Sequence, residues 1–233
     1  MLALHTAPER ALPIVAEARL LHGALGDMRE TVQGALRVSL PVDMAYHMVT
    51  PLLPEFAERH PLLRVDFDIT PRKVDLIGEP FDLAIRTGKL PDLGYIATPL
   101  AKFSGCLYAA PDYLAKRGEP QSPADLAAHE CLRFGTDGTV WTLQNGSDRA
   151  TVQPESRYGA NSPGMIRQMT AAGLGIALLP DILVREDVAQ GRLKPILEDW
   201  QSEETPVHTL TATRLLTANV RTLVGFLKEK WAG

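Results

Sequence analysis

The sequence predicts an α/β fold in which mostly parallel strands are flanked by helices. Short runs with apolar residues at every second position alternate with helical stretches from Gly34 onward. A strand, helix, strand, helix, strand order of this kind implies parallel strands joined by right-handed crossovers. The 233 residues are 45% apolar and 22% charged, which suits one large domain or two small lobes.

The first half of the chain carries the clearest pattern. Alternating apolar residues predict three strands, marked by Leu36, Val38 and Leu40, then Val65, Phe67 and Ile69, then Phe81, Leu83 and Ile85. A turn at Pro41–Asp43 and a helical stretch to His60 should connect the first two strands. Pro51 and Pro54 should confine the regular part of that helix to residues 52–60, because proline cannot donate a backbone hydrogen bond.

The second half has strong start and stop signals for its elements. Strands are predicted at Ser104–Ala109, 175–180 and Pro206–Ala212, and helices at Pro111–Gly118, from Ser122, at Asn161–Ala172, from a cap at Asp181 and at Asn219–Trp231. Ser122 and Asp125 have the spacing of a capping box. Asn145-Gly146 is a strong hairpin signal.

Residues 11–33 have the heptad pattern of a helix that pairs with another helix. Apolar residues recur at alternating steps of three and four, and they are Ala11, Ile14, Ala18, Leu21, Leu25, Met28 and Val32. Gly23 and Gly26 each cost a helix interior about 1 kcal/mol relative to alanine, so this helix should need a partner. That partner is either a second copy of the chain or the chain's own globular body.

Composition and charge exclude several classes of protein. The net charge of −4 gives no basic footprint for nucleic acid. No run approaches the length of a membrane span, and the N-terminus, with Glu9 and Glu17, does not resemble a secretory signal. We therefore expect a cytoplasmic protein that makes no membrane contact. Cys106 and Cys131 have no metal-ligand spacing and are expected to be buried thiols.

Small polar residues stand where the predicted strands end, which is where open α/β sheets bind ligands. These strand ends are Pro41–Asp43, Thr70-Pro71, Arg86–Gly88 and Asn161-Ser162. Arg86 could hold a carboxylate or phosphate with its fork of donors, or it could pair with Asp82 on the same strand face. Asn161 or Ser162 could line a site, or one of them could simply cap a helix.

No catalytic or cofactor motif stands out. The six histidines have no metal-binding spacing, and the chain has neither a nucleophile elbow nor a phosphate-binding glycine loop. Asp43 facing His47 or Tyr46 is the only loose acid–base candidate. We predict no cofactor, no metal and no enzymatic activity.

A series of motifs, in order, resembles the effector-binding domain of LysR-type transcriptional regulators. The motifs are GALRVSLP, LLPEFAERHP, VDLIGEPFDLAIRTGKLPD, CLYAAPDYLAKRGEPQSPADLAAHECLRF and AAGLGIALLPDILV. The resemblance covers Gly34 to the end, and residues 9–33 resemble the family's linker helix, which pairs with its partner in a dimer. The family's winged helix-turn-helix should precede that helix, and this chain has no room for it. We therefore expect no specific DNA binding by this chain alone.

The resemblance implies two α/β lobes like those of type II periplasmic binding proteins, after a linker helix at residues 1–33. Lobe I would comprise residues 34–108 and 209–233, and lobe II residues 109–208. Two crossover strands would join the lobes near residues 104–110 and 205–212. A small effector would bind between the lobes, and its binding would change how the oligomer holds promoter DNA.

The resemblance also implies which residues contact the effector. They are Val42, Asp43, Met44 and Thr70 in lobe I and Phe134, Gly135, Asn161 and Ser162 in lobe II, to which the strand-end argument adds Arg86. The strand that carries Arg86 has a form common in one branch of the family whatever the ligand, so this arginine could instead fix lobe geometry. Asp43 replaces a small hydroxyl residue often found in that loop, and its charge would repel a bare carboxylate. An anionic or amphoteric metabolite that also carries a donor or an amine is therefore expected.

The function implied is that of a ligand-sensing and oligomerisation module of a LysR-type regulator. It would be a homodimer or homotetramer that reaches promoter DNA only through an N-terminal domain absent from this chain. One alternative is a stand-alone solute-binding protein, which would need a secretory signal. The other is a small-molecule enzyme on the same fold, which would need an acid–base pair across the cleft.

Removal of residues 1–33 tests the heptad pattern. Because an amphipathic helix with two interior glycines needs a partner, we expect the full chain to be dimeric and the truncated chain to be monomeric. Light scattering coupled to size-exclusion chromatography measures both masses. A truncated chain that stays dimeric at the same concentration would contradict the pairing role of this helix.

Overall fold

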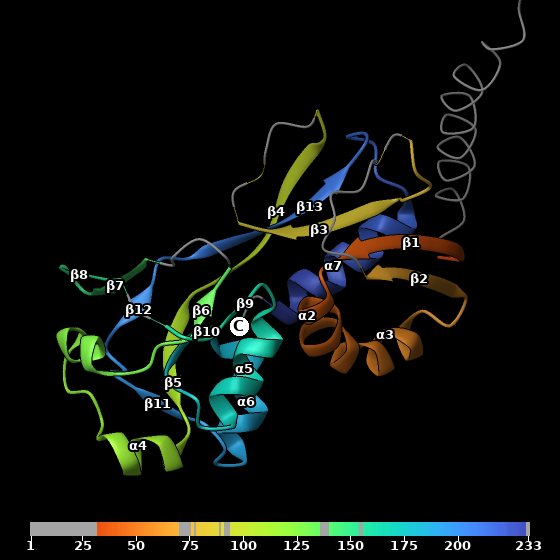
Figure 1. Ribbon diagram of the computed structural model, residues 1–233. Coiled ribbons are helices and arrows are strands. Elements are labelled where there is room, and N and C mark those ends of the chain that lie inside the picture. Colours follow the sequence, from red (N-terminus) through yellow and green to blue (C-terminus); the bar gives the residue numbers. More distant parts are fainter. Residues whose placement is uncertain are drawn as a thin grey trace, which may run out of the picture. The chain divides into compact units, whose positions relative to one another are not determined.

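The computed structural model describes residues 32–69, 76, 78–88, 90, 94–135, 140–153 and 156–231. The chain forms two compact units, each built of strands and helices (Figure 1). One unit extends to Ala101 and resumes at Pro206, and the other runs from Lys102 to Thr205. The helix predicted at residues 11–33 lies outside the described residues, apart from Val32 and Gln33.

The first unit is built on one mixed sheet of five strands, in the order β2-β1-β3-β13-β4. The strands are β1 (Gly34–Leu40), β2 (Leu63–Ile69), β3 (Leu83–Thr87), β4 (Ile96–Phe103) and β13 (Thr205–Thr211). β1 pairs in parallel with both β2 and β3, as the strand and helix order predicts. β13 joins the other side of β3 in the antiparallel direction.

Helices α3 (Leu53–Arg59) and α7 (Ala218–Trp231) cover one face of this sheet (Figure 1). Leu36, Val38 and Leu40 of β1 are fully buried. Phe56 of α3 and Phe226 of α7 meet edge to face with ring centroids 5.0 Å apart, so the two helices form a single apolar layer. This layer secures β1, the strand that leads into the first predicted ligand-binding loop.

The sequence predicts a turn at Pro41–Asp43, but the chain is already helical from Val42. It runs through α2 (Val42–Met44), a π-helical turn (Ala45–Val49) and a 3-10 turn (Thr50–Leu52) before α3. Pro51 has no N–H to bond the carbonyl group four residues earlier, so an α-helix cannot continue through it. The chain widens instead, and the Thr50 hydroxyl donates to the Ala45 carbonyl at 2.8 Å. The predicted confinement of the regular helix by two prolines is confirmed.

The second unit contains smaller sheets. Its strands are β5 (Gly105–Ala109), β6 (Arg133–Phe134), β7 (Trp141–Asn145), β8 (Asp148–Val152), β9 (Gly159–Ala160), β10 (Ala177–Pro180), β11 (Lys194–Ile196) and β12 (Gln201–Ser202). They form the sheets β10-β5-β11, β12-β7-β8 and β6-β9, of which only the last is parallel. The hairpin predicted at Asn145-Gly146 joins β7 to β8, and Gly146 has the positive φ of 57° that such a turn needs.

Helices cover both faces of β5. The helices of this unit are α4 (Pro111–Arg117), the 3-10 helix η3 (Pro123–Ala128), α5 (Pro163–Ala171) and α6 (Asp181–Ala189). One apolar cluster joins Leu107 to α4, η3 and Trp141, and another joins Cys106 and Tyr108 to α5 and α6. Strand β5 is therefore the centre of two apolar layers, which explains why its five residues are all buried.

The boundary between the two units falls within β4, and β5 lies wholly in the second unit. The lobe bounds implied by the resemblance, with crossovers near residues 104–110 and 205–212, stay a prediction. Two elements differ from what the sequence predicts. β4 was not predicted, because Pro99 and its polar neighbours weaken the strand pattern at this sheet edge. Asp181 does not cap α6. Pro180 is the N-cap, and the Asp181 carboxylate accepts a hydrogen bond from the Tyr108 hydroxyl at 2.7 Å.

A pair of glycine substitutions tests the packing of the second unit. A Cβ at Gly175 would lie 2.4 Å from the carbonyl oxygen of Glu130, so Gly175→Ala should lower the free energy of unfolding by about 1–3 kcal/mol. Gly225 lies in α7 with open space around it, so Gly225→Ala should raise the free energy of unfolding by up to about 1 kcal/mol. Urea unfolding measures both variants, and equal stability of the two would contradict the close contact at Gly175.

Candidate functional site

The first unit places several predicted ligand-binding residues at one edge of its sheet. β1 and β3 run in parallel, so the loop after β1 (Pro41–Met44) and the end of β3 (Arg86–Gly88) lie at the same edge, here called the first edge. Met44 is buried, whereas Val42 is 37% exposed. Asp43 stands in the first helical turn, where its negative charge complements the exposed N–H groups of the helix start.

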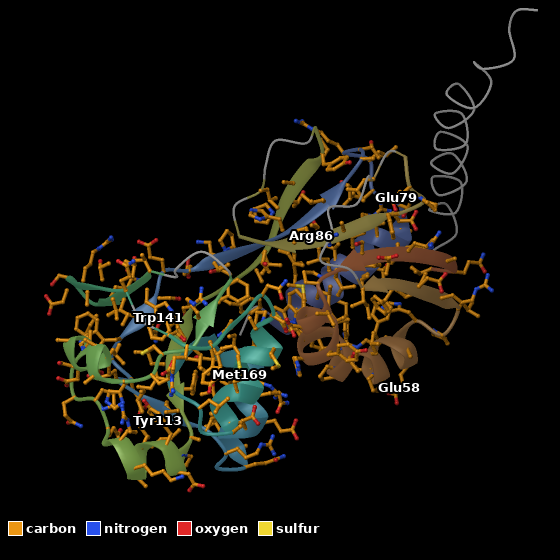
Figure 2. All side chains as sticks on the ribbon, viewed as in Figure 1. Glu58, Glu79, Arg86, Tyr113, Trp141 and Met169 are labelled. Atoms are coloured by element: carbon orange, nitrogen blue, oxygen red, sulfur yellow. The ribbon has the colours of Figure 1, made fainter. Side chains whose placement is uncertain are left out.

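Arg86 ties β3 to β1 (Figure 2). Its guanidinium group donates to the Ser39 hydroxyl at 2.8 Å and to the Ser39 carbonyl at 3.0 Å. It also donates to the carbonyl of the preceding residue, Ile85, at 2.7 Å. Ser39 is fully buried, so its hydroxyl needs a partner inside the protein. These hydrogen bonds support the hypothesis that Arg86 fixes the geometry of the sheet.

Asp82, the alternative partner suggested for Arg86, is instead hydrogen-bonded to Arg37, at the opposite end of the β1–β3 pair. Its carboxylate accepts the Arg37 N–H at 2.8 Å, and its own N–H donates to the Arg37 carbonyl at 3.0 Å. On the other side of β3, Arg86 is the cross-strand neighbour of His208 in β13. Residue spacing along the chain gave no signal for either Ser39 or His208 as neighbours of Arg86.

The second unit places four further predicted residues at one edge, here called the second edge. β6 and β9 are parallel, with Arg133 opposite Gly159 and Phe134 opposite Ala160. The residues that follow the two strands are Gly135 and Asn161-Ser162. The Gly135 N–H donates to the Ala160 carbonyl at 2.9 Å. Gly135 has a φ of 84°, which favours glycine at this position.

The second edge combines hydrogen-bond donors with exposed apolar side chains. Ser162 is the N-cap of α5, as one of the two sequence hypotheses proposes, and its hydroxyl accepts the Met165 N–H at 3.1 Å. Phe134 and Met165 are 50% and 53% exposed. The start of α5 can attract an anionic or polar group, and the Phe134 ring offers apolar contact area beside it.

The remaining candidates for chemistry are buried or dispersed. Both cysteines are buried, as predicted, and burial is the main cause that raises the pKa of each thiol to about 12, so both stay protonated. Within the described residues, no three histidine, cysteine, aspartate or glutamate side chains gather as a metal site would require. The described helices also include none that is long and apolar enough to span a membrane.

Sheets of this kind, with polar residues after their parallel strands, are typical of α/β domains that bind small molecules. A family model described as the LysR substrate binding domain matches residues 29–232. The HTH-type transcriptional regulator CrgA of Neisseria meningitidis serogroup C is 32% identical over 228 residues, which are 95% of this chain and 75% of that protein. The regulator PtxR of Pseudomonas aeruginosa is 32% identical over 216 residues, 90% of this chain and 69% of that protein.

Solved structures agree with the sequence relatives. The regulatory domain of CrgA from Neisseria meningitidis superposes with a TM-score of 0.75 at 31% identity, covering 86% of this chain and 100% of that one. A second CrgA structure gives a TM-score of 0.77 at 30% identity, over 97% of this chain and 78% of that one. The chain belongs to the LysR substrate-binding-domain family, and the expected two-lobe α/β fold of the periplasmic-binding-protein type is confirmed.

The structure brings the predicted residues together in two groups. Val42, Asp43, Met44 and Arg86 lie at the first edge, and Phe134, Gly135, Asn161 and Ser162 at the second. Thr70 lies outside the described residues. Effector contact by each of these residues stays a prediction.

Alanine substitution of Arg86 tests its structural role. Removing the guanidinium group leaves the buried Ser39 hydroxyl and carbonyl without these donors, so Arg86→Ala should lower the free energy of unfolding by about 2–3 kcal/mol. The double variant Arg86→Ala/Ser39→Ala should lose less free energy of unfolding than the two single variants lose in sum. Arg64→Ala, at an exposed position of β2, is the matched control and should change stability by no more than about 0.5 kcal/mol. Equal urea midpoints for Arg86→Ala and Arg64→Ala would assign Arg86 no structural role.

Proposed function

We propose that the chain senses a small anionic or amphoteric metabolite and transmits its binding to transcription. The observation that carries this proposal is the match of residues 29–232 to a ligand-binding family. The relatives of the chain are named as transcriptional regulators, and the chain spans about three quarters of CrgA. A regulator of this kind responds to a ligand by a population shift, which requires different affinities in the two conformations.

The first and second edges are the proposed contact surfaces. At the second edge, the N–H groups at the start of α5 would receive the negative group of the effector, while Phe134 would contact its apolar part. At the first edge, the Asp43 carboxylate would favour an effector that also carries a donor or an amine. The other members of the proposed set are Val42, Met44, Thr70, Arg86, Gly135, Asn161 and Ser162.

The same proposal assigns the partners of the chain. We propose a homodimer or homotetramer that reaches promoter DNA through a separate DNA-binding domain, in the cytoplasm, where that DNA lies. The relatives are regulators, so we propose that the chain binds its ligand without converting it and uses neither a metal nor a cofactor.

Thermal unfolding against a panel of small carboxylates, amino acids, aromatic acids and sugar phosphates tests the proposed function. A ligand at 100 times its dissociation constant adds about 2.7 kcal/mol, which at this size raises Tm by roughly 5–10 °C. A shift of that size is expected for at least one compound class. A flat response across the whole panel, from a protein that unfolds cooperatively, would count against the sensing role.

Two serine variants then locate the bound compound. Ser162 caps α5 at the second edge, whereas Ser122 caps η3, a helix of the same unit that follows neither β6 nor β9. Each alanine variant should lose about 1 kcal/mol of stability. Only Ser162→Ala should also lower the affinity for the compound found in the panel, as measured by calorimetry. Equal affinities in Ser162→Ala and Ser122→Ala would remove Ser162 from the proposed set.

A further inference from the structure

Tyr113 and the partly exposed His129 form a hydrogen-bonded pair in the second unit, at the start of the segment that leads to the second edge. Tyr113 lies on α4 (Figure 2). Its side chain is buried, with 6% of its surface exposed. Its hydroxyl oxygen accepts the backbone N–H of Glu130 at 3.0 Å. The same oxygen lies 3.2 Å from Nδ1 of His129, and the two rings are tilted with centroids 5.8 Å apart.

The hydroxyl hydrogen of Tyr113 can be the donor in its contact with His129. Because the oxygen accepts from Glu130, its hydrogen is free to donate to Nδ1 of a neutral His129 that carries its own proton on Nε2. An imidazolium has a hydrogen on both nitrogens and cannot accept this bond. The hydroxyl hydrogen would then turn toward the apolar cluster around α4, where a polar group without a partner is costly.

The groups that face His129 favour the neutral imidazole. Burial lowers the pKa of His129, Arg117 on α4 lowers it further, and Asp125 on η3 opposes both. The Asp125 carboxylate is already occupied, since it accepts the N–H groups of Gln121 and Ser122, each at 2.9 Å. The neighbouring Glu130 carboxylate accepts the N–H and Nε of Arg157 at 2.7 and 3.0 Å. Burial also raises the pKa of Tyr113, which keeps its hydroxyl protonated.

A run of backbone hydrogen bonds leads from Glu130 to the second edge. The bonds are Ile176 N–H to Glu130 carbonyl at 2.8 Å, Leu132 N–H to Ile176 carbonyl at 2.7 Å, Arg133 N–H to Tyr158 carbonyl at 3.0 Å and Gly135 N–H to Ala160 carbonyl at 2.9 Å. The close approach of Gly175 to the Glu130 carbonyl leaves little room for local adjustment. A shift of the Glu130 amide therefore acts on the whole run, including Phe134 and Gly135.

We propose that His129 is a pH-responsive control of the second edge: protonation of its imidazole breaks the bond with Tyr113 and loosens the backbone from Glu130 to Gly135. The locally open form has a histidine of ordinary pKa and binds a proton first as the pH falls. The backbone hydrogen bonds from Glu130 to Gly135 are therefore fully formed above a pH of about 6.5 and open more often below it. The inference goes beyond ligand sensing, and its test needs no ligand.

Amide hydrogen exchange measured by NMR on the whole chain tests this control. Between pH 8 and pH 5 the protection factors of Leu132 and Gly135, corrected for intrinsic exchange rates, should fall several-fold, with about 30-fold as the limit for an open-form pKa of 6.5. His129→Gln keeps an acceptor for the Tyr113 hydroxyl but does not titrate, so its protection factors should be independent of pH. His60→Gln, in the first unit beside Phe56, is the matched control and should keep the wild-type pH dependence.

Two further measurements make the assignment specific. Tyr113→Phe removes the acceptor of the Glu130 N–H, so protection at Leu132 and Gly135 should be low at both pH values. The ¹⁵N shifts of His129 at pH 8 should report a proton on Nε2. Wild-type protection that does not change with pH, an unchanged pH dependence in His129→Gln, or a proton on Nδ1 at pH 8 would each overturn the proposal.

Discussion

Parallel pairing of neighbouring strands is the constraint on which both candidate edges depend. β1 pairs in parallel with β3 in the first unit, and β6 pairs in parallel with β9 in the second. Parallel strands end at the same edge of a sheet, so the residues that follow them come together whatever their side chains are. At both edges the chain then enters a helix, whose first N–H groups have no partner within the helix. The polar character of each edge is therefore a consequence of strand direction.

Two arginines, the partly buried Arg86 and the buried Arg167, hold the elements behind these edges. Arg86 joins β3 to β1 through uncharged acceptors on Ser39, whereas Arg167 of α5 donates to the Asp187 carboxylate of α6 at 2.8 Å. Asp187 is 2% exposed and is also bonded by Nε of Arg192 at 2.7 Å, so its charge is fully paired. Losing one member of such a buried set leaves the other without compensation, which makes these arrangements specific for one geometry.

The two edges differ in how firmly the backbone holds them. At the first edge, β1 pairs with β3 over two residues but is also held on its other side by β2 over seven residue pairs, whereas β6 and β9 share only two. The second edge therefore depends on single contacts, among them the bond from Gly135 to Ala160 and the approach of Gly175 to Glu130. Segments with few backbone bonds open at low free-energy cost, and binding regions are commonly drawn from them. A single side chain such as Tyr113 can consequently influence this edge more than it could influence the first.

The sequence by itself determined the strand and helix order, the capping residue Ser122, the Asn145-Gly146 hairpin and most of the residues at the two edges, because these signals depend on neighbours along the chain. Strand β4 escaped prediction, because an edge strand interrupted by Pro99 has no clear alternation. Only the tertiary structure decided the partners. Ser39 lies 47 residues before Arg86, so no pattern along the chain predicts that the two side chains meet. Ser39 is buried in a strand that lies between β2 and β3, with the Arg86 guanidinium group against its hydroxyl. The Tyr108 bond to Asp181, which spans 73 residues, has no local signal either.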